Sequence, residues 1–128
     1  MKGRRDDGGP HGILVVDKPQ GPTSHDIVQS ARRLLHTRRV GHAGTLDPMA
    51  TGVLVLLLGE ATKLSEIATA ADKTYRARVS FGRATDSHDA DGRTTAEAAV
   101  DLDEIGTAAL SRALANWNRA RDGTGDTR

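Results

Sequence analysis

The hydrophobic residues of the first forty positions predict a short strand followed by an amphipathic helix. The branched run Ile13–Val16 is bounded by Gly12 and Pro19, which predicts a buried strand that ends in a turn. Thr23 or Ser24 can then cap a helix. The polar side of the helix is basic toward its end. The apolar residues that recur at helical spacing after this cap are Ile27, Val28, Ala31, Leu34 and Leu35.

A segment without periodicity separates these elements from the next ones. Residues Val40–Gly52 break the pattern, with three glycines and a proline between Gly41 and Gly52, and predict a shaped loop. Val53–Leu58 is a continuous apolar run of strand length, and a strand there is expected to be buried on both faces. Helical spacing predicts a helix over Lys63–Ala71. Strict alternation predicts the clearest strand of the chain over Thr74–Phe81.

The last third of the chain carries weaker patterns. Gly82–Thr95 is polar and predicts a loop, whereas Asp103–Trp117 predicts a helix with an inner apolar stripe. The compositions of residues 1–11 and 116–128 predict a flexible basic arm and a disordered tail. Strands separated by helices predict a mixed α/β (α+β) fold, in which a mixed sheet is flanked by helices. The expected inner stripe of the last helix is Ile105, Ala109, Leu110, Ala113 and Leu114.

Composition and charge mainly exclude classes of partner and of chemistry. The 128 residues, of which 37% are hydrophobic, suit a single folded domain. The 18 basic and 17 acidic residues nearly cancel, so the overall charge requires neither nucleic acid nor an anionic membrane as a partner. The absence of Cys excludes disulfides and thiolate chemistry. Because the longest apolar run is much shorter than a membrane span, no membrane partner and a cytoplasmic location are expected.

The loop Gly41–Gly52 is the most informative segment for chemistry. Its glycines permit backbone shapes that let a substrate approach closely. Asp47 precedes Pro48, which disfavours helical backbone at Asp47 and can turn its carboxylate outward. An isolated Asp-Pro pair is typical of a turn, whereas a presented carboxylate can be a nucleophile or an acid/base. The residues alone leave both interpretations open.

The acidic loop near residue 90 offers a metal site as a second interpretation. Asp89, Asp91 and Gly92 are similar to the middle of a calcium-binding EF-hand loop. The first ligand position holds Ser87, however, and the position of the final glutamate holds Ala98. We therefore expect a polar turn and no metal.

Several motifs of the chain together resemble one family. The segment Gly41–Gly52 resembles the signature loop of the bacterial tRNA pseudouridine synthase B family, and Gly12–Gly21 is similar to its Lys-Pro motif. Three further motifs follow in the family's order, so the resemblance extends over roughly residues 11–115. These motifs are Gly59–Lys63, Asp72–Tyr75 and Thr85–Gly92.

The resemblance implies an isomerase that converts the T-loop uridine at position 55 of tRNA to pseudouridine, without cofactor or metal. It implies that Asp47 is the catalytic aspartate, acting by covalent addition or by proton abstraction. The matching Tyr75 would pack on the extruded uracil, and His42 would stand beside the flipped nucleotide. Lys18 would support the site or a phosphate.

The same residues have ordinary structural interpretations. Alone, Tyr75 on the apolar side of a strand is typical of a core aromatic, His42 of a surface or capping position, and Lys18 of a solvated turn. Arginine pairs on a helix are usually solvated. With the resemblance, the cations of the front half become candidates for contacts with the RNA backbone: Arg32, Arg33, Arg38, Arg39 and Lys63.

Members of this family continue past the length of this chain, with further strands and an arginine that pairs with the catalytic aspartate. We therefore expect residues 12–115 to form the N-terminal part of a pseudouridine synthase catalytic domain, monomeric if it folds. In such an incomplete sheet, Val53–Leu58 is the expected exposed edge. Residues 116–128 depart from the family and have the composition of a truncated or frame-shifted end. The alternative function is that of a noncatalytic RNA-binding or inert fragment of such an enzyme.

Overall fold

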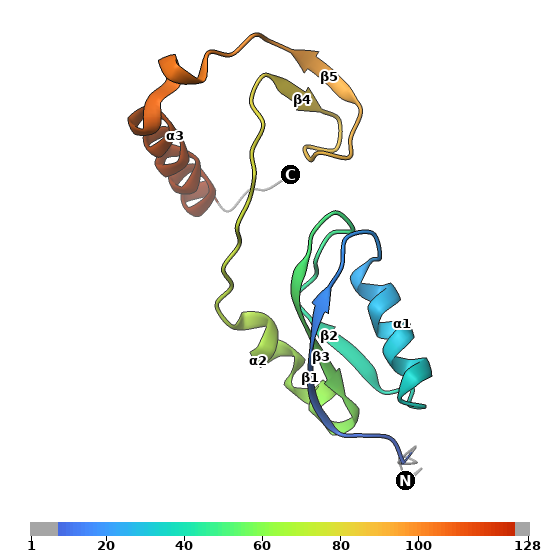
Figure 1. Ribbon diagram of the computed structural model, residues 1–128. Helices are drawn as coiled ribbons and strands as arrows, with labels where there is room; N and C mark the ends of the chain where they lie inside the picture. The colour runs from blue at the N-terminus through green and yellow to red at the C-terminus, as the bar shows by residue number, and fades with distance from the viewer. Residues whose placement is uncertain (1–7, 125–128) are drawn as a thin grey trace. The chain divides into compact units, whose positions relative to one another are not determined.

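The computed structural model describes residues 8–124 (Figure 1). These residues belong to two units, Met1–Arg76 and Ala77–Arg128. Its content of helices and small sheets confirms the mixed α/β class. The elements of the first unit are β1 (Gly12–Lys18), α1 (Ser24–Leu34), β2 (Val40–Ala43), β3 (Gly52–Leu58), the 3-10 helix η1 (Gly59–Leu64) and α2 (Ser65–Ala70). Those of the second unit are β4 (Arg83–Thr85), β5 (Thr94–Glu97) and α3 (Leu102–Thr124).

β3 is the central strand of the first unit. It pairs antiparallel with β1 on one side and with β2 on the other, and Val55 lies opposite both Val15 and Ala43. The expectation that Val53–Leu58 forms the exposed edge is therefore wrong, because the edges are β1 and β2. All strand pairs in residues 8–124 are antiparallel, so the expected mixed sheet is not found there. The short connection between β2 and β3 favours this antiparallel pairing.

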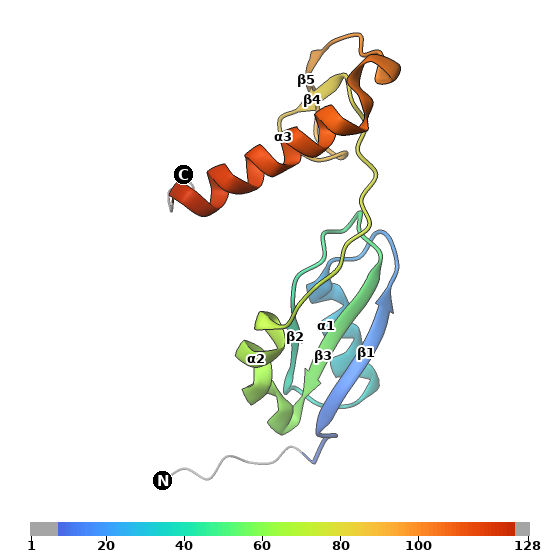
Figure 2. The ribbon, with the colours of Figure 1, turned by 90° about the vertical axis from the view of Figure 1, so that its left-hand side faces the viewer.

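Helix α1 covers one face of this sheet, and it passes behind the strands in Figure 2. The strand residues on this face alternate with residues that point to the opposite face. The predicted stripe is confirmed except at Leu34, whose side chain points away from the sheet and is 79% exposed. The buried residues of this core are Val28, Ala31, Val40, Leu54, Leu56 and Leu58.

The start of α1 is fixed by a capping box. The Thr23 hydroxyl accepts a hydrogen bond from the Asp26 amide at 3.0 Å, and the Asp26 carboxylate accepts one from the Thr23 amide at 2.8 Å. The hydrogen bond from the Thr23 amide, and after it the Thr23 side chain, favour the charged carboxylate and hold the pKa of Asp26 below its ordinary value of 3.8. The sequence signal at Thr23 is therefore confirmed as the helix start.

Three predictions for the first unit need correction. Residues Val40–Ala43 form β2 rather than the start of a loop, because their backbone groups pair with the end of β3. The helix predicted over Lys63–Ala71 is divided into η1 and the short α2, and Ile67 on its apolar side is 72% exposed. His11, at the end of the predicted flexible arm, accepts a hydrogen bond from the Glu60 amide at 3.0 Å. Residues 1–7 of that arm lie outside the described part of the chain.

The predicted strand Thr74–Phe81 is not a strand. A strand needs a neighbour for its backbone hydrogen bonds, and no strand within residues 8–124 pairs with this segment. Its alternating apolar residues consequently stay exposed, among them Tyr75 and Val79. The alternation describes a segment suited to a sheet that the described residues do not complete.

The second unit differs from its prediction in two places, the segment expected to be a loop and the last helix. β4 and β5 form a hairpin where Gly82–Thr95 was expected to be irregular, because backbone pairing does not require apolar side chains. The predicted helix is confirmed, but α3 continues to Thr124, with non-helical backbone at Gly106. Positions 116–124, expected in a disordered tail, are thus helical. Leu114 of the expected inner stripe is 63% exposed, and residues 125–128 lie outside the described part.

Within the described residues, no helix has both the length and the apolar character that crossing a bilayer requires.

We expect Thr23→Ala to lower the free energy of unfolding by about 1 kcal/mol, because the Asp26 amide loses its acceptor. The lowered pKa of Asp26 means that its contribution is present above its unfolded value and is lost as pH falls through the folded value. The variant removes the contribution of the Thr23 side chain to this lowering but keeps the backbone donor of residue 23, so it should lose slightly less stability between pH 7 and pH 3 than the unmodified chain. Urea unfolding followed by circular dichroism measures both effects.

The matched control is Thr107→Ala, at an exposed position of α3. It should change the free energy of unfolding by less than about 0.5 kcal/mol. An equal loss in the two variants would show that the hydroxyl of Thr23 has no special role.

Candidate functional site

Asp47 lies in the loop between β2 and β3, where its side chain is exposed. Its carbonyl oxygen accepts a hydrogen bond from the Ala50 amide at 2.9 Å, which closes a turn with Pro48 in second position. The Asp-Pro pair therefore does form a turn. This local role is compatible with a chemical one, because the turn leaves the carboxylate outside.

The buried ammonium group of Lys18 holds this loop through hydrogen bonds to its backbone. Lys18, at the end of β1, has a relative exposure of 0%. Its ammonium group donates to the carbonyl oxygens of Pro19 at 2.9 Å, Ala50 at 2.7 Å and Pro48 at 3.4 Å. Burying an ammonium group is costly unless such acceptors replace its water. The interpretation of Lys18 as a solvated turn residue is therefore wrong.

The first turn of α1 holds the other side of the loop. The hydroxyl of Ser24, which is buried, donates to the Leu46 carbonyl at 3.0 Å and lies 2.9 Å from the Leu46 amide, from which it accepts. The Gly21 amide donates to the Pro48 carbonyl at 2.8 Å. Residues on both sides of Asp47 are thus tied to elements more than twenty positions earlier in the chain.

The carboxylate of Asp47 is left without a partner by this arrangement. No hydrogen bond or ion pair links it to any residue in the described range 8–124. A fixed backbone with an open carboxylate is suited to addition to an electrophilic carbon or to accepting a proton, because little ordering is required when a substrate arrives.

The other two predicted site residues are His42 and Tyr75, of which His42 is closer to the loop in sequence. His42 lies on β2 and is half-buried, with Nδ1 3.2 Å from the carbonyl oxygen of Gly44. A proton placed on Nδ1 makes this contact a hydrogen bond and leaves Nε2 as an acceptor, although that placement is an assignment from geometry. Gly44, with φ +80°, is the first residue of the loop.

Tyr75 is not brought into contact with Asp47 within the described residues. Its ring is 67% exposed in a segment without regular structure, so the interpretation as a core aromatic is wrong. Lys73, two positions earlier, passes over the loop start: a Cβ atom on Gly44 would lie 3.1 Å from its Cε. The tyrosine therefore follows a residue that packs on the loop.

The structure divides the five candidate RNA-binding cations. Arg39 and Lys63 both pair with the Glu60 carboxylate. The hydrogen bond from Lys63 and, next in size, that from Arg39 lower the pKa of Glu60 to about 2. Arg32 donates to the Val40 carbonyl at 3.0 Å, and its Nε is buried without a hydrogen-bond partner among the described residues. Arg33 and Arg38 are exposed. Arg32, Arg39 and Lys63 thus have polar partners within the first unit, and exposed Arg33 donates to the Ser30 hydroxyl at 3.2 Å.

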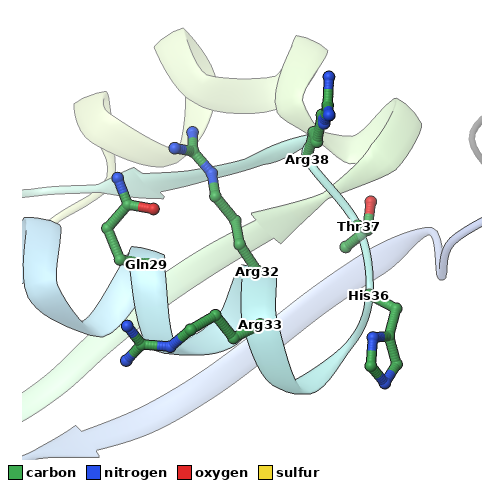
Figure 3. Close-up of a pocket in the computed structure, with 6 residues that line it drawn as sticks. All are labelled: Gln29, Arg32, Arg33, His36, Thr37 and Arg38. Atoms are coloured by element: carbon green, nitrogen blue, oxygen red, sulfur yellow. The ribbon is translucent and has the colours of Figure 1, made fainter.

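Arg33 and Arg38 border a pocket of about 650 Å³ at the C-terminal end of α1 (Figure 3). No carboxylate lies among the side chains that line it. At about 1.5 Å per residue, the helix places Arg33 about 14 Å from Ser24 along its axis, at the far end from the Asp47 loop. The lining residues are Gln29, Arg32, Arg33, His36, Thr37 and Arg38.

The carboxylates of the predicted polar turn have partners within the turn. Asp89 accepts from the Ser87 hydroxyl at 2.6 Å and from the Asp91 amide at 3.0 Å, and these hydrogen bonds lower its pKa. Asp86 accepts from Arg93. Across residues 8–124, no three or more His, Cys, Asp or Glu side chains gather as metal ligands would.

Sequence patterns did not reveal the long-range anchors of the loop. Ser24 was recognised only as a possible helix cap, because a hydrogen bond to Leu46 leaves no local pattern. The packing of Lys73 on Gly44 was missed for the same reason. The glycine in that position was the one available signal, since glycine permits both the positive φ and the close approach.

Comparison with known proteins assigns this loop to a family. Residues 32–122 match the family model described as "TruB family pseudouridylate synthase (N terminal domain)". The chain belongs to this family. It is 56% identical over 81 residues to tRNA pseudouridine synthase B of Opitutus terrae, which covers 63% of this chain and 34% of that protein. It is 52% identical over 100 residues to the protein of that name from Mycobacterium sp. strain KMS, which covers 76% of this chain and 34% of that protein.

A solved structure titled "Structure of H/ACA RNP bound to a substrate RNA containing 2'-deoxyuridine" is 42% identical, with a TM-score of 0.43, over 44% of this chain and 18% of that one. The chain thus spans about one third of the length of the two curated relatives. The family assignment confirms the resemblance given by the sequence motifs.

We expect Lys18→Met to loosen the loop that carries Asp47. The variant removes the Lys18 donor from the Pro19 and Ala50 carbonyls, whereas the Pro48 carbonyl keeps the Gly21 amide, and this loss should cost roughly 1–3 kcal/mol of unfolding free energy. Hydrogen exchange should quicken at the amides of residues 46–51 beyond the change expected from global stability alone. Urea unfolding and hydrogen-exchange mass spectrometry measure the two effects.

Lys63→Met is the control, because Lys63 is an exposed partner of Glu60. It should cost less than about 1 kcal/mol and leave exchange in the loop unchanged. If loop exchange in Lys18→Met matched that of the control, the buried ammonium would not be the anchor.

Proposed function

We propose that this chain is the N-terminal part of a tRNA pseudouridine synthase catalytic domain and that Asp47 is its catalytic residue. The observation that carries the proposal is the open carboxylate of Asp47 on a loop held by Lys18 and Ser24. Lys18 and Asp47 belong to the motifs that resemble the family. The proposed substrate is the T-arm of tRNA, with uridine 55 as the target.

The proposed reaction is an isomerisation, so no atom is gained and no redox step is needed. The bond from the ribose to N1 of the uracil breaks, the base turns, and a carbon–carbon bond forms at C5. The proton from C5 is lost, and N1 regains one. Asp47 contributes either by adding to the nucleotide or by taking a proton from the ribose, and both routes require the ionised carboxylate.

The target base must leave its stack before this reaction, at a cost of a few kcal/mol. We assign His42 to the space beside the flipped nucleotide and Tyr75 to stacking on the uracil. The support for Tyr75 is its exposed ring, which follows Lys73 at the loop start. The support for His42 is its position two residues before the loop.

We further propose that the RNA backbone passes over the exposed cations near the end of α1. Among the five candidates, Arg33 and Arg38 are favoured because their side chains are exposed beside the pocket at the end of α1. Phosphate contacts of this kind would position the tRNA without reading its sequence. A monomer acting in the cytoplasm, without metal or cofactor, completes the proposal.

A second candidate is a noncatalytic RNA-binding or inert fragment. One observation favours it: within the described residues, the Asp47 carboxylate has no cationic group to hold it charged and aimed.

We expect Asp47→Asn to reduce pseudouridine formation by at least about a hundredfold, because the amide can neither add to the nucleotide nor accept the proton. The assay follows release of tritium from C5 of the uridines in unmodified tRNA. Asp103→Asn, an exposed position in α3, is the matched control and should retain the rate of the unmodified chain.

Equal rates for Asp47→Asn and the unmodified chain would refute the role of Asp47. If the unmodified chain binds tRNA but releases no tritium, the noncatalytic candidate is supported instead.

We expect the double variant Arg33→Gln, Arg38→Gln to weaken tRNA binding and to make it less sensitive to salt. Each lost phosphate contact should reduce the slope of log K against log salt by about 0.7–0.9. Filter binding between about 50 and 200 mM salt measures the slope. Arg93→Gln in the second unit is the control and should leave the slope unchanged. An unchanged slope in the double variant would exclude these two phosphate contacts.

A further inference from the structure

The pocket at the C-terminal end of α1 is lined mainly by basic side chains. Arg32, Arg33 and Arg38 line it together with His36 (Figure 3). The lining includes no acidic residue, although acidic and basic residues nearly balance over the whole chain. A guanidinium group presents a planar fork of N–H donors that matches the oxygens of an anion. The pocket therefore has the composition of an anion-binding site.

Arg32 is the arginine of this pocket that the fold holds in place. Its Nη2 donates a hydrogen bond to the Val40 carbonyl of β2 at 3.0 Å, whereas its Nε is buried and has no hydrogen-bond partner among the described residues. A buried donor without an acceptor raises the free energy of the folded chain. An anion in the pocket can accept from this Nε after a small rotation of the side chain. Binding would thus remove a cost that the free chain carries.

Arg33 is the next residue of α1, and its side chain is exposed. Its Nη2 donates to the Ser30 hydroxyl at 3.2 Å, which orders the side chain and uses one of the five N–H donors of the guanidinium. Because a side chain that is already ordered loses less entropy on binding, this contact favours capture of an anion.

The turn after α1 brings the third arginine to the pocket. The Thr37 amide donates to the Arg32 carbonyl at 3.2 Å, and His36 between them has a φ of 49°. This is the geometry of a helix end at which glycine is the usual residue. The turn reverses the chain, so that Arg38 lines the same pocket as Arg32.

The backbone of the helix does not favour an anion here. The C-terminal end of a helix carries a negative charge equivalent to roughly half an electron. Each guanidinium carries a full positive charge, so the arginines together outweigh the helix end. The proposed site therefore depends on side chains, and on more than one of them.

A phosphate group fits this arrangement better than a carboxylate. A carboxylate has two oxygens in one plane, and a single guanidinium can bind both. The oxygens of a phosphate are arranged as a tetrahedron and accept from donors on different sides. The donors of the pocket come from two positions on α1 and from the turn that follows it.

We propose that the pocket at the end of α1 binds one phosphate group, with Arg32 and Arg33 as its main donors and Arg38 as a further cation. The group belongs either to an RNA backbone or to a free phosphate compound, since both present the same oxygens. Only the assignment to RNA rests on the proposed function. The pocket lies about 14 Å along α1 from Ser24, so the bound phosphate anchors a ligand away from the Asp47 loop.

NMR of the arginine Nε–H groups in the isotope-labelled chain tests the proposal directly. Inorganic phosphate should shift the signals of Arg32 and Arg33 in a saturable way, whereas chloride and acetate at the same ionic strength should not. A hairpin with the sequence of a tRNA T-arm should shift the same two signals, and added phosphate should compete with the hairpin.

Arg32→Lys distinguishes a built site from general attraction between charges. The variant keeps the positive charge but loses the Nε donor and the planar fork, so its affinity for phosphate should fall at least about fivefold. Arg39→Lys is the matched control and should keep the affinity, because Arg39 pairs with Glu60 and does not line the pocket. Melting followed by circular dichroism checks that both variants fold. If Arg32→Lys does not fold, the signals of the unmodified chain decide the question.

Three results would overturn the proposal: phosphate shifts neither signal, acetate shifts both signals as strongly, or folded Arg32→Lys binds phosphate as tightly as the unmodified chain. Shifts with phosphate but not with the hairpin would support the phosphate site and assign it to a free phosphate compound. None of these measurements involves turnover or Asp47, so their failure leaves the proposed catalysis to be judged by tritium release.

Discussion

The ammonium group of Lys18 joins two parts of the first unit that are distant in sequence, the end of β1 and the loop that carries Asp47. It lies at the end of β1, next to the turn at Pro19, and it reaches the carbonyl oxygens of Pro48 and Ala50 on either side of Met49. A buried cation tolerates few arrangements, because each lost acceptor leaves part of its charge unsolvated. The position of the loop relative to β1 is therefore set by this requirement, and the free carboxylate of Asp47 depends on it.

The central position of β3 explains why the first unit can support such a site. Antiparallel neighbours on both sides satisfy the backbone of β3, and α1 packs on Leu54 and Leu56. The loop of Asp47 ends where β3 begins, so one flank of the loop continues into the best-buried strand of the unit. Pairing, core packing and the buried lysine thus stabilise the same short segment.

The sequence allowed prediction of the elements whose signals are local. The strand at Ile13–Val16, the helix capped by Thr23 and the strand at Val53–Leu58 carry their periodicity and boundaries in adjacent residues. Val40–Ala43 was missed because its glycine and histidine hide the pattern of a strand that exists only through pairing with β3. Thr74–Phe81 failed for the opposite reason, since its alternation is clear but no described strand pairs with it. The family and the candidate aspartate were recognisable from contiguous motifs, whereas the burial of Lys18 and the pairing of Arg39 with Glu60 depend on contacts between distant residues.

Ser24 has a double position in the fold that links helix stability to site geometry. It is the first residue of α1 and also the group that holds both backbone atoms of Leu46. Helix ends fray more readily than helix centres, and each opening of this first turn would let go of the peptide just before Asp47. The peptide before Asp47 therefore keeps its position only while this first helical turn stays closed.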